Sequence, residues 1–219
     1  MAAEREARVE RVVAHAPGTR TLVLRLPPGE RLAFRPGQFV SCLLPVGGER
    51  LIRPYSIASS PEEPARLEIL LDLVPGGPGS RHLFGLGPGD RLRFTGPWGT
   101  FVLDRPPDAE AVFVAAETGI APIRPMLRRA AATAVHPLRL LYGTALGLYH
   151  DELAALPGVT VEVVAPRALE AAVAARFIQA DDDRSRHFYL CGVGEQVTRL
   201  RDGLRAAGYA RRAVQYEKW

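Results

Sequence analysis

The sequence predicts a two-domain protein: an N-terminal antiparallel Greek-key β-barrel, then a C-terminal α/β doubly wound parallel sheet. In the first half, short apolar strands alternate at even spacing with turns rich in glycine and proline. After Arg105–Asp108 the pattern changes, and buried apolar runs alternate with helical segments. We therefore expect residues 1–105 and 106–219 to form separate domains.

The first half divides into expected strands at its turn signals. Pairs such as Pro36-Gly37 and Pro88-Gly89 favour turns and separate the apolar runs. A helix should follow the glycine-rich loop before Ser80, with Ser80 as its cap, because serine is a preferred capping residue. The expected strands are Arg8–His15, Arg20–Leu26, Gln38–Leu44, Leu51–Ala58, Leu67–Val74 and Arg91–Thr95, and the expected helix is Ser80–Leu86.

The second half alternates strands with helices. Its first strand, Ala111–Ala116, is apolar throughout, which is typical of a strand buried on both faces. The further strands are expected at Leu138–Gly143, Val159–Ala165, His187–Leu190 and Ala213–Tyr216, and the helices at Gly119–Ala134, His150–Leu156, Ala168–Arg176 and Glu195–Ala207.

Composition narrows the class of protein. The chain has 219 residues, of which 47% are hydrophobic, as in globular proteins. No window reaches the roughly 18–20 uninterrupted apolar residues of a membrane span. The N-terminal residues mix charges and lack the apolar segment of a signal peptide. We therefore expect a cytoplasmic protein without a membrane span.

Charge and cysteine content exclude further classes. The net charge is +4, and basic residues are interleaved with acidic ones, which argues against nucleic-acid binding. Cys42 and Cys191 are the only cysteines, too few for a four-thiolate iron–sulfur cluster or a structural zinc site. The five histidines show no metal-binding spacing. We expect no metal, and we expect Cys42 to be a core residue.

The segment Arg53-Pro54-Tyr55-Ser56 carries the first functional signal. The planar guanidinium of arginine pairs with two phosphate oxygens at once. The tyrosine ring can pack on a flat heterocycle, to which the serine hydroxyl can bond. Pro54 lacks an amide donor, which favours an edge strand. Taken alone, the segment also fits an ordinary strand that ends in a serine-rich turn.

A second signal follows at Gly77, Gly79 and Ser80. Glycines at the start of a helix let a diphosphate approach the free backbone amides. Taken alone, this segment also fits a flexible loop before a capped helix. Together with the Arg53 strand, it indicates a flavin site.

Two loops of the second half lie where doubly wound sheets bind nucleotides, after the carboxyl ends of strands. Thr118 and Gly119 follow the first strand, and Cys191 and Gly192 follow a later one. The alternative for Cys191 is a small buried thiol that fills space. The chain ends on Trp219 directly after a strand, which favours docking of this end over fraying.

These motifs, in this order and over nearly the whole chain, resemble the ferredoxin–NAD(P)H reductase superfamily. Arg53, Tyr55 and Ser56 match its flavin motif, and Gly77, Gly79 and Ser80 match its pyrophosphate turn. The matches to its nicotinamide side are Thr118, Gly119 and Pro122 in the Gly-Thr-Gly-x-x-Pro loop, Cys191 and Gly192 in the Cys-Gly-Pro motif, and Glu217 with Trp219 at the C-terminal acid and aromatic positions.

The resemblance implies a flavin-dependent oxidoreductase. FAD would be bound by the barrel domain, and NADH or NADPH would donate a hydride to it at a site lined by Ser56, Cys191, Glu217 and Trp219. Electrons would then pass to a separate redox protein: a ferredoxin, a flavodoxin or an oxygenase component. Two alternatives stay open, an NAD(P)H:flavin reductase that uses diffusible flavin and a non-catalytic flavin-bearing subunit of a larger complex.

The chain departs from the family pattern at several positions. Glu117 stands where the family usually has glycine, and Val193 replaces a proline. Gly143, expected at the cofactor, is not followed by the arginine that often meets the adenosine ribose or its 2′-phosphate. The sequence therefore favours NADH over NADPH. No long loop follows Pro61 to cover the FAD adenine, which suggests loosely held FAD.

Overall fold

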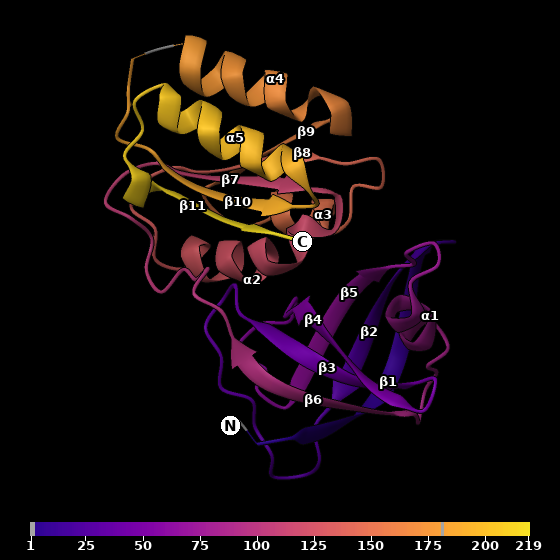
Figure 1. Cartoon of the computed structure of the whole chain (residues 1–219). Helices are drawn as coiled ribbons and strands as arrows, with labels where there is room; N and C mark the ends of the chain where they lie inside the picture. Colours follow the sequence, from indigo (N-terminus) through magenta and orange to yellow (C-terminus); the bar gives the residue numbers. More distant parts are fainter. Residues whose placement is uncertain (1–2, 181) are drawn as a thin grey trace. The chain divides into compact units, whose positions relative to one another are not determined.

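The computed structural model describes residues 3–180 and 182–219. The chain divides into two compact units, the first ending at Val102 and the second beginning at Leu103. The antiparallel strands belong to the first unit and the parallel sheet to the second, as Figure 1 shows. The fold class expected from the sequence is confirmed.

The first unit is a six-stranded antiparallel sheet with the strand order β4-β3-β6-β1-β2-β5. An antiparallel bridge between Ile57, just after β4, and Ile69 in β5 joins the two edges, so the sheet closes into a barrel. The strands are β1 Arg5–Ala16, β2 Thr19–Arg25, β3 Phe39–Val46, β4 Glu49–Ser56, β5 Arg66–Asp72 and β6 Arg91–Trp98.

Apolar side chains from all six strands fill the interior of the barrel. Leu22, Leu24, Ile69 and Phe94 are fully buried there. Cys42 lies among them with no exposed surface, so its expected place in the core is confirmed. Burial raises the pKa of the Cys42 thiol to about 12.

The short helix α1, Pro78–Phe84, begins two residues earlier than expected. The cap is Gly77, so the prediction that Ser80 caps this helix is wrong. Proline is favoured at the first helical position because its φ is already helical and it has no amide hydrogen to satisfy. Ser80 therefore lies in the first turn, where its hydroxyl accepts a hydrogen bond from the Val74 amide at 3.0 Å.

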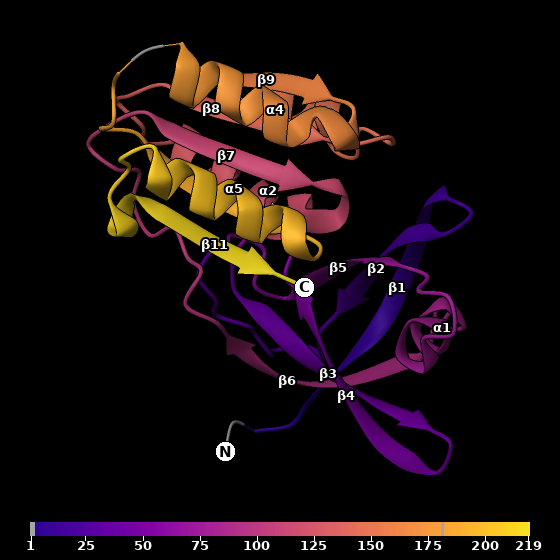
Figure 2. The same ribbon diagram turned by 45° about the horizontal axis from the view of Figure 1, so that its top comes forward.

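The second unit is a five-stranded parallel sheet with the order β11-β10-β7-β8-β9. The arrows of β7, β9 and β11 point the same way in Figure 2. Helices α4 and α5 cover one face of the sheet and α2 covers the other (Figure 1). The elements are β7 Ala111–Ala116, α2 Ile120–Ala131, β8 Leu138–Gly143, α3 His150–Ala154, β9 Val159–Val164, α4 Leu169–Ala174, β10 His187–Gly192, α5 Glu195–Ala206 and β11 Val214–Lys218.

The order of these strands defines where a ligand can bind. From the central strand β7 the chain proceeds outward to β8 and β9, and then returns to the other side for β10 and β11. The order reverses between β7 and β10, and doubly wound sheets bind ligands outside the carboxyl ends of strands at such a point. We call the carboxyl ends of β7 to β11 the carboxyl edge.

Residues 3–180 and 182–219 contain neither a long apolar helix nor a cluster of metal-ligating side chains. None of the helices there has the length and apolar character that a membrane crossing needs. No three side chains of His, Cys, Asp or Glu lie close enough together there to hold a metal ion.

Candidate functional site

The guanidinium of Arg53 on β4 is exposed and available to an anion. Its Nη1 donates to the carbonyl of Ile52 at 2.9 Å, and among the described residues it forms no ion pair. Arg50, on the same strand, is paired with Glu4 at 2.6 Å. The difference marks Arg53 as the cation of this strand that could hold a phosphate.

Gly79 places the first turn of α1 directly against Arg53. A Cβ at Gly79 would stand 3.1 Å from Cγ of Arg53 and 3.3 Å from Leu44 and Leu51. A side chain there would therefore crowd these three side chains, which would have to shift to make room for it. The structure thus brings together the arginine strand and the glycine turn, which lie apart in the sequence.

Ser56, the last residue of β4, is a buried hydroxyl without a partner. The residue is only 5% exposed, and among the described residues its Oγ has no hydrogen-bond partner. Leaving such a group unsatisfied costs about 1–3 kcal/mol. A ligand that bonds to this hydroxyl would remove that cost, so the site fits a flavin whose ring edge carries hydrogen-bonding atoms.

Tyr55 contributes an apolar ring to the same end of β4. It is half-buried and packs against the barrel core. Burial is the main reason that its pKa rises to about 12, with the neighbouring Cys42 acting in the same direction and Arg53 against it. The phenol is therefore neutral at physiological pH.

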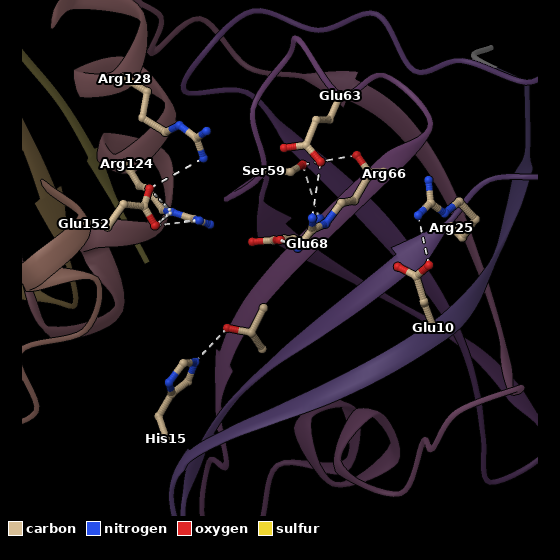
Figure 3. A network of polar contacts seen from close by, with 11 residues as sticks. Glu10, His15, Arg25, Ser59, Glu63, Arg66, Glu68, Arg124, Arg128 and Glu152 are labelled. Atoms are coloured by element: carbon tan, nitrogen blue, oxygen red, sulfur yellow. Dashed lines mark hydrogen bonds and ion pairs between the residues drawn. The ribbon is translucent and has the colours of Figure 1, made fainter. Parts of the chain in front are cut away.

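A polar cluster just beyond Ser56, not identified from the sequence, holds this segment against β5 (Figure 3). The Ser59 hydroxyl accepts from the amide of Glu68 at 3.2 Å and donates to the carbonyl of Arg66 at 3.3 Å. The guanidinium of Arg66 pairs with the carboxylates of Glu68 and Glu63. Glu68 is buried. A charged residue inside an otherwise apolar strand was the sequence signal that could have indicated this cluster.

At the carboxyl edge, the ends of β7 and β10 meet through main-chain contacts. A Cβ at Gly119 would stand 2.3 Å from the carbonyl oxygen of Cys191, and one at Gly192 would stand 2.6 Å from Cβ of Ala116. Real Cβ atoms do not approach so closely, so both positions require glycine. The Thr118 and Cys191 loops therefore form one surface at the point where the strand order reverses.

Cys191 is a buried thiol in this surface. It lies opposite Ala115 of β7 and Glu217 of β11 in the strand register. Burial, with a smaller effect from the negative charge of Glu217, raises its pKa well above the ordinary value. The thiol is protonated at neutral pH and the residue is only 1% exposed, so a ligand could contact it only after the groups that cover it move.

Trp219 is docked by its main chain. Its amide donates to the carbonyl of Gly192 at 3.2 Å, and its carbonyl accepts from the amide of Gly194 at 3.1 Å. These bonds carry the β10–β11 pairing beyond Lys218. Glu217 and Trp219 are thereby placed beside the Cys191 loop.

The remaining candidates are Gly143, Pro122 and Pro54. A Cβ at Gly143 would stand 2.9 Å from Cδ2 of Leu169, so this glycine lets α4 pack on the end of β8. Pro122 is buried in the first turn of α2. Pro54 is exposed on β4, an end strand of the sheet order, opposite Ser41 of β3.

Arg167 is a basic residue of the carboxyl edge that the sequence analysis missed. It is exposed in the short turn Pro166–Ala168, directly after the end of β9. The sequence pattern of the family places the expected arginine after Gly143, at the end of β8. Because β9 is parallel to β8 and beside it, its end was an equally good place to look.

Comparisons with known proteins agree with this arrangement. Residues 6–103 match the family model described as the oxidoreductase FAD-binding domain. The chain is 33% identical to ferredoxin–NADP reductase B of Sorangium cellulosum, over 98% of this chain and 97% of that protein. It is 42% identical to the reductase subunit of an aromatic O-demethylase of Amycolatopsis, but over 57% of this chain and 37% of that protein.

Solved structures show the same fold. A cytochrome P450 reductase of Amycolatopsis matches with a TM-score of 0.80 at 29% identity, over 100% of this chain and 71% of that one. A ferredoxin NADP⁺ reductase of Neisseria gonorrhoeae, solved with bound FAD and NADP, matches with a TM-score of 0.80 at 23% identity, over 100% and 99% of the two chains. With the full-length similarity to the Sorangium protein, the conclusion is that the chain belongs to the ferredoxin–NADP reductase family of FAD-binding oxidoreductases.

Proposed function

We propose that this protein takes a hydride from a nicotinamide dinucleotide onto FAD and delivers electrons to a separate redox protein. Residues 1–105 are assigned to FAD binding and 106–219 to dinucleotide binding. The observation that carries the proposal is the buried Ser56 hydroxyl, which has no partner among the described residues and lies on the same strand as the unpaired Arg53.

On the flavin side, Arg53 is proposed to hold the diphosphate where Gly77, Gly79 and Ser80 begin α1. Tyr55, with Pro54 beside it, would cover the ring system, and Ser56 would donate its proton to a ring nitrogen. FAD supplies the chemistry of accepting a hydride and releasing electrons one at a time. The protein contributes binding, alignment and a donor at a fixed position.

On the nicotinamide side, Thr118, Gly119, Pro122 and Gly143 are proposed to form the walls of the dinucleotide site, although Gly143 also serves α4 packing. Cys191 and Gly192 would pack against the nicotinamide as a neutral surface. Glu217 would hold the proton that accompanies the hydride transfer. Trp219 would control how closely the nicotinamide ring can approach.

NADH is the proposed donor, with NADPH as the competing candidate. The missing arginine after Gly143 favours NADH, because a 2′-phosphate would lack a bidentate partner there. Arg167, just after the end of β9, favours NADPH because its guanidinium could pair with the 2′-phosphate. The two nucleotides must therefore be tested side by side.

The acceptor is proposed to be a ferredoxin, a flavodoxin or an oxygenase component. The Sorangium relative carries the name of a ferredoxin reductase, and a further relative is the reductase component of a propane 2-monooxygenase of Mycolicibacterium goodii. The cytoplasm stays the predicted compartment.

The direct experiment is anaerobic addition of NADH, and separately of NADPH, to the FAD-loaded protein while the flavin absorbance is followed. Rapid bleaching supports the proposal. A flavin band that neither nucleotide bleaches overturns it in favour of a non-catalytic flavin-bearing subunit. Reduction of flavin that is lost on gel filtration would instead favour a flavin reductase with a diffusible substrate.

Ser56→Ala tests the role assigned to the hydroxyl. We expect flavin reduction to slow by about 10- to 100-fold, while the dissociation constant of FAD changes by less than about fivefold. The control is Ser41→Ala, the same change on the adjacent strand β3, which should reduce as fast as the unmodified protein. Equal losses in rate and affinity, or none, would contradict the assignment.

A further inference from the structure

Glu117 has a backbone conformation that glycine adopts more easily. Its φ is 48°, in the left-handed region, and only one other non-glycine residue in the described part of the chain has positive φ. For an L-residue this conformation costs roughly 1–2 kcal/mol. Strained residues persist where their surroundings hold them in place, and they gather at functional sites.

The side chain of Glu117 is held across the end of the neighbouring strand. Its Oε2 accepts from the hydroxyl of Thr144 at 3.1 Å and from the amide of Ala145 at 3.4 Å. The Thr144 hydroxyl itself accepts from the amides of Leu146 at 3.0 Å and Gly147 at 3.1 Å. Since its acceptor positions are used in this way, its single proton is directed to Glu117.

The main chain of Glu117 is held as well. The hydroxyl of the buried Tyr142, on β8, donates to the carbonyl of Glu117 at 3.1 Å. The residue is thus bonded through its main chain and through its carboxylate to the end of β8. This double attachment explains how a left-handed glutamate persists, and it gives the carboxylate a defined place above the ends of β7 and β8.

A carboxylate at this place has a definite chemical preference. In doubly wound sheets, an acidic residue near the end of the second strand accepts a hydrogen bond from the 2′-hydroxyl of the adenosine ribose. A 2′-phosphate at the same point would meet a like charge, which costs affinity. Here the acid comes from the end of the first strand, β7, and reaches over to the second, β8.

We propose that Glu117 is a specificity-determining residue that selects dinucleotides with a free ribose 2′-hydroxyl against 2′-phosphorylated ones. This inference rests on the proposed function, since it assumes that the carboxyl edge binds a dinucleotide. The exposed Arg167 at the end of β9 acts in the opposite direction. The preference measured for the protein is the balance of the two.

The test is equilibrium binding of NAD⁺ and NADP⁺ to the oxidised, FAD-loaded protein by titration calorimetry, which requires no turnover. Glu117→Gln removes the charge and keeps an acceptor for Thr144. We expect it to tighten NADP⁺ binding by about tenfold and to change NAD⁺ binding by less than about threefold. Glu117→Gly, which suits the left-handed backbone, provides a second variant in case the glutamine variant does not fold.

Asp151→Asn is the matched control. It removes the same charge from a fully exposed position on α3, so it should leave the ratio of the two dissociation constants unchanged. If the unmodified protein binds both nucleotides and neither Glu117 variant shifts the ratio beyond twofold, the inference is overturned and the proposed function stands. If the unmodified protein binds neither nucleotide, the proposed function is overturned and the inference with it.

Discussion

The end of β4 and the Glu117 loop at the carboxyl edge of the parallel sheet satisfy their polar groups in opposite ways. At β4, the Ser56 hydroxyl is buried without a partner among the described residues, and Arg53 has no carboxylate beside it there. At the carboxyl edge, Glu117 is bonded to Thr144, and Gly119 packs against the main chain of Cys191.

This difference suggests two kinds of ligand. A site with unmet polar groups gains most from a resident molecule that bonds to them continuously. A site whose groups already bond to one another can release and rebind a ligand without leaving those groups exposed. The contrast fits a cofactor that stays on the barrel and a dinucleotide that comes and goes.

The largest expected effect is at the carboxyl edge, with Gly119→Ala. The added Cβ would stand 2.3 Å from the Cys191 carbonyl, so the two loops must separate. We expect a loss of about 3 kcal/mol in the free energy of unfolding. Urea unfolding measures it, and Gly203→Ala is the control: in the last turn of α5, with no neighbouring atom within 4 Å of the added Cβ, it should gain about 0.5–1 kcal/mol. A neutral Gly119→Ala would show that the loops yield easily.

The next effect is at β4, with Arg53→Ala. Loss of a charged hydrogen-bonding partner costs about 1.5–3 kcal/mol, so FAD should bind roughly 10- to 150-fold more weakly. Titration of the apoprotein with FAD, followed by fluorescence quenching, gives the dissociation constant. Arg50→Ala, on the same strand and paired with Glu4, should bind FAD normally. Equal affinities in the two variants would remove Arg53 from the site.

A smaller effect distinguishes the apo and FAD-loaded forms of Ser56→Ala. Without FAD, the variant loses a buried hydroxyl that has no partner among the described residues, so the apoprotein should be more stable by up to about 1 kcal/mol. With FAD, this gain should disappear, because the flavin then bonds to the hydroxyl of the unmodified protein. Thermal unfolding of both forms measures the difference. A variant that is destabilised without FAD would show that the protein itself satisfies this hydroxyl.

The smallest effect concerns the two thiols. Burial raises the pKa of both Cys42 and Cys191, so both are protonated at pH 8 and neither should react with a thiol reagent before unfolding. Each thiol has a higher pKa in the folded protein than its unfolded value near 9. The free energy of unfolding is therefore undiminished below that value and falls as the pH rises above it. Counting reactive thiols against pH checks the first point, and urea unfolding over the same pH range checks the second. Earlier reaction of Cys191 would mean that the carboxyl edge opens more readily than the barrel.

Local patterns in the sequence predicted the order of the elements, because apolar runs and glycine or proline turns act over a few residues. The start of α1 was misplaced because Pro78 favours the first helical position more strongly than Ser80 favours the cap. Contacts between strand ends could not be predicted in this way. The bond from Thr144 to Glu117 joins residues 27 apart in the chain, and only the parallel pairing of β7 with β8 brings them together.

The pairing of β1 has a consequence for biosynthesis. Arg5 of β1 lies opposite Phe94 of β6, so the strand made first must wait for the strand that completes the barrel. The parallel sheet instead can grow outward from β7, since β8 and β9 follow it directly and add to one side. On the ribosome, the unit translated first therefore stays incomplete until its last strand has left the exit tunnel, and its apolar strands are exposed to chaperones during that interval.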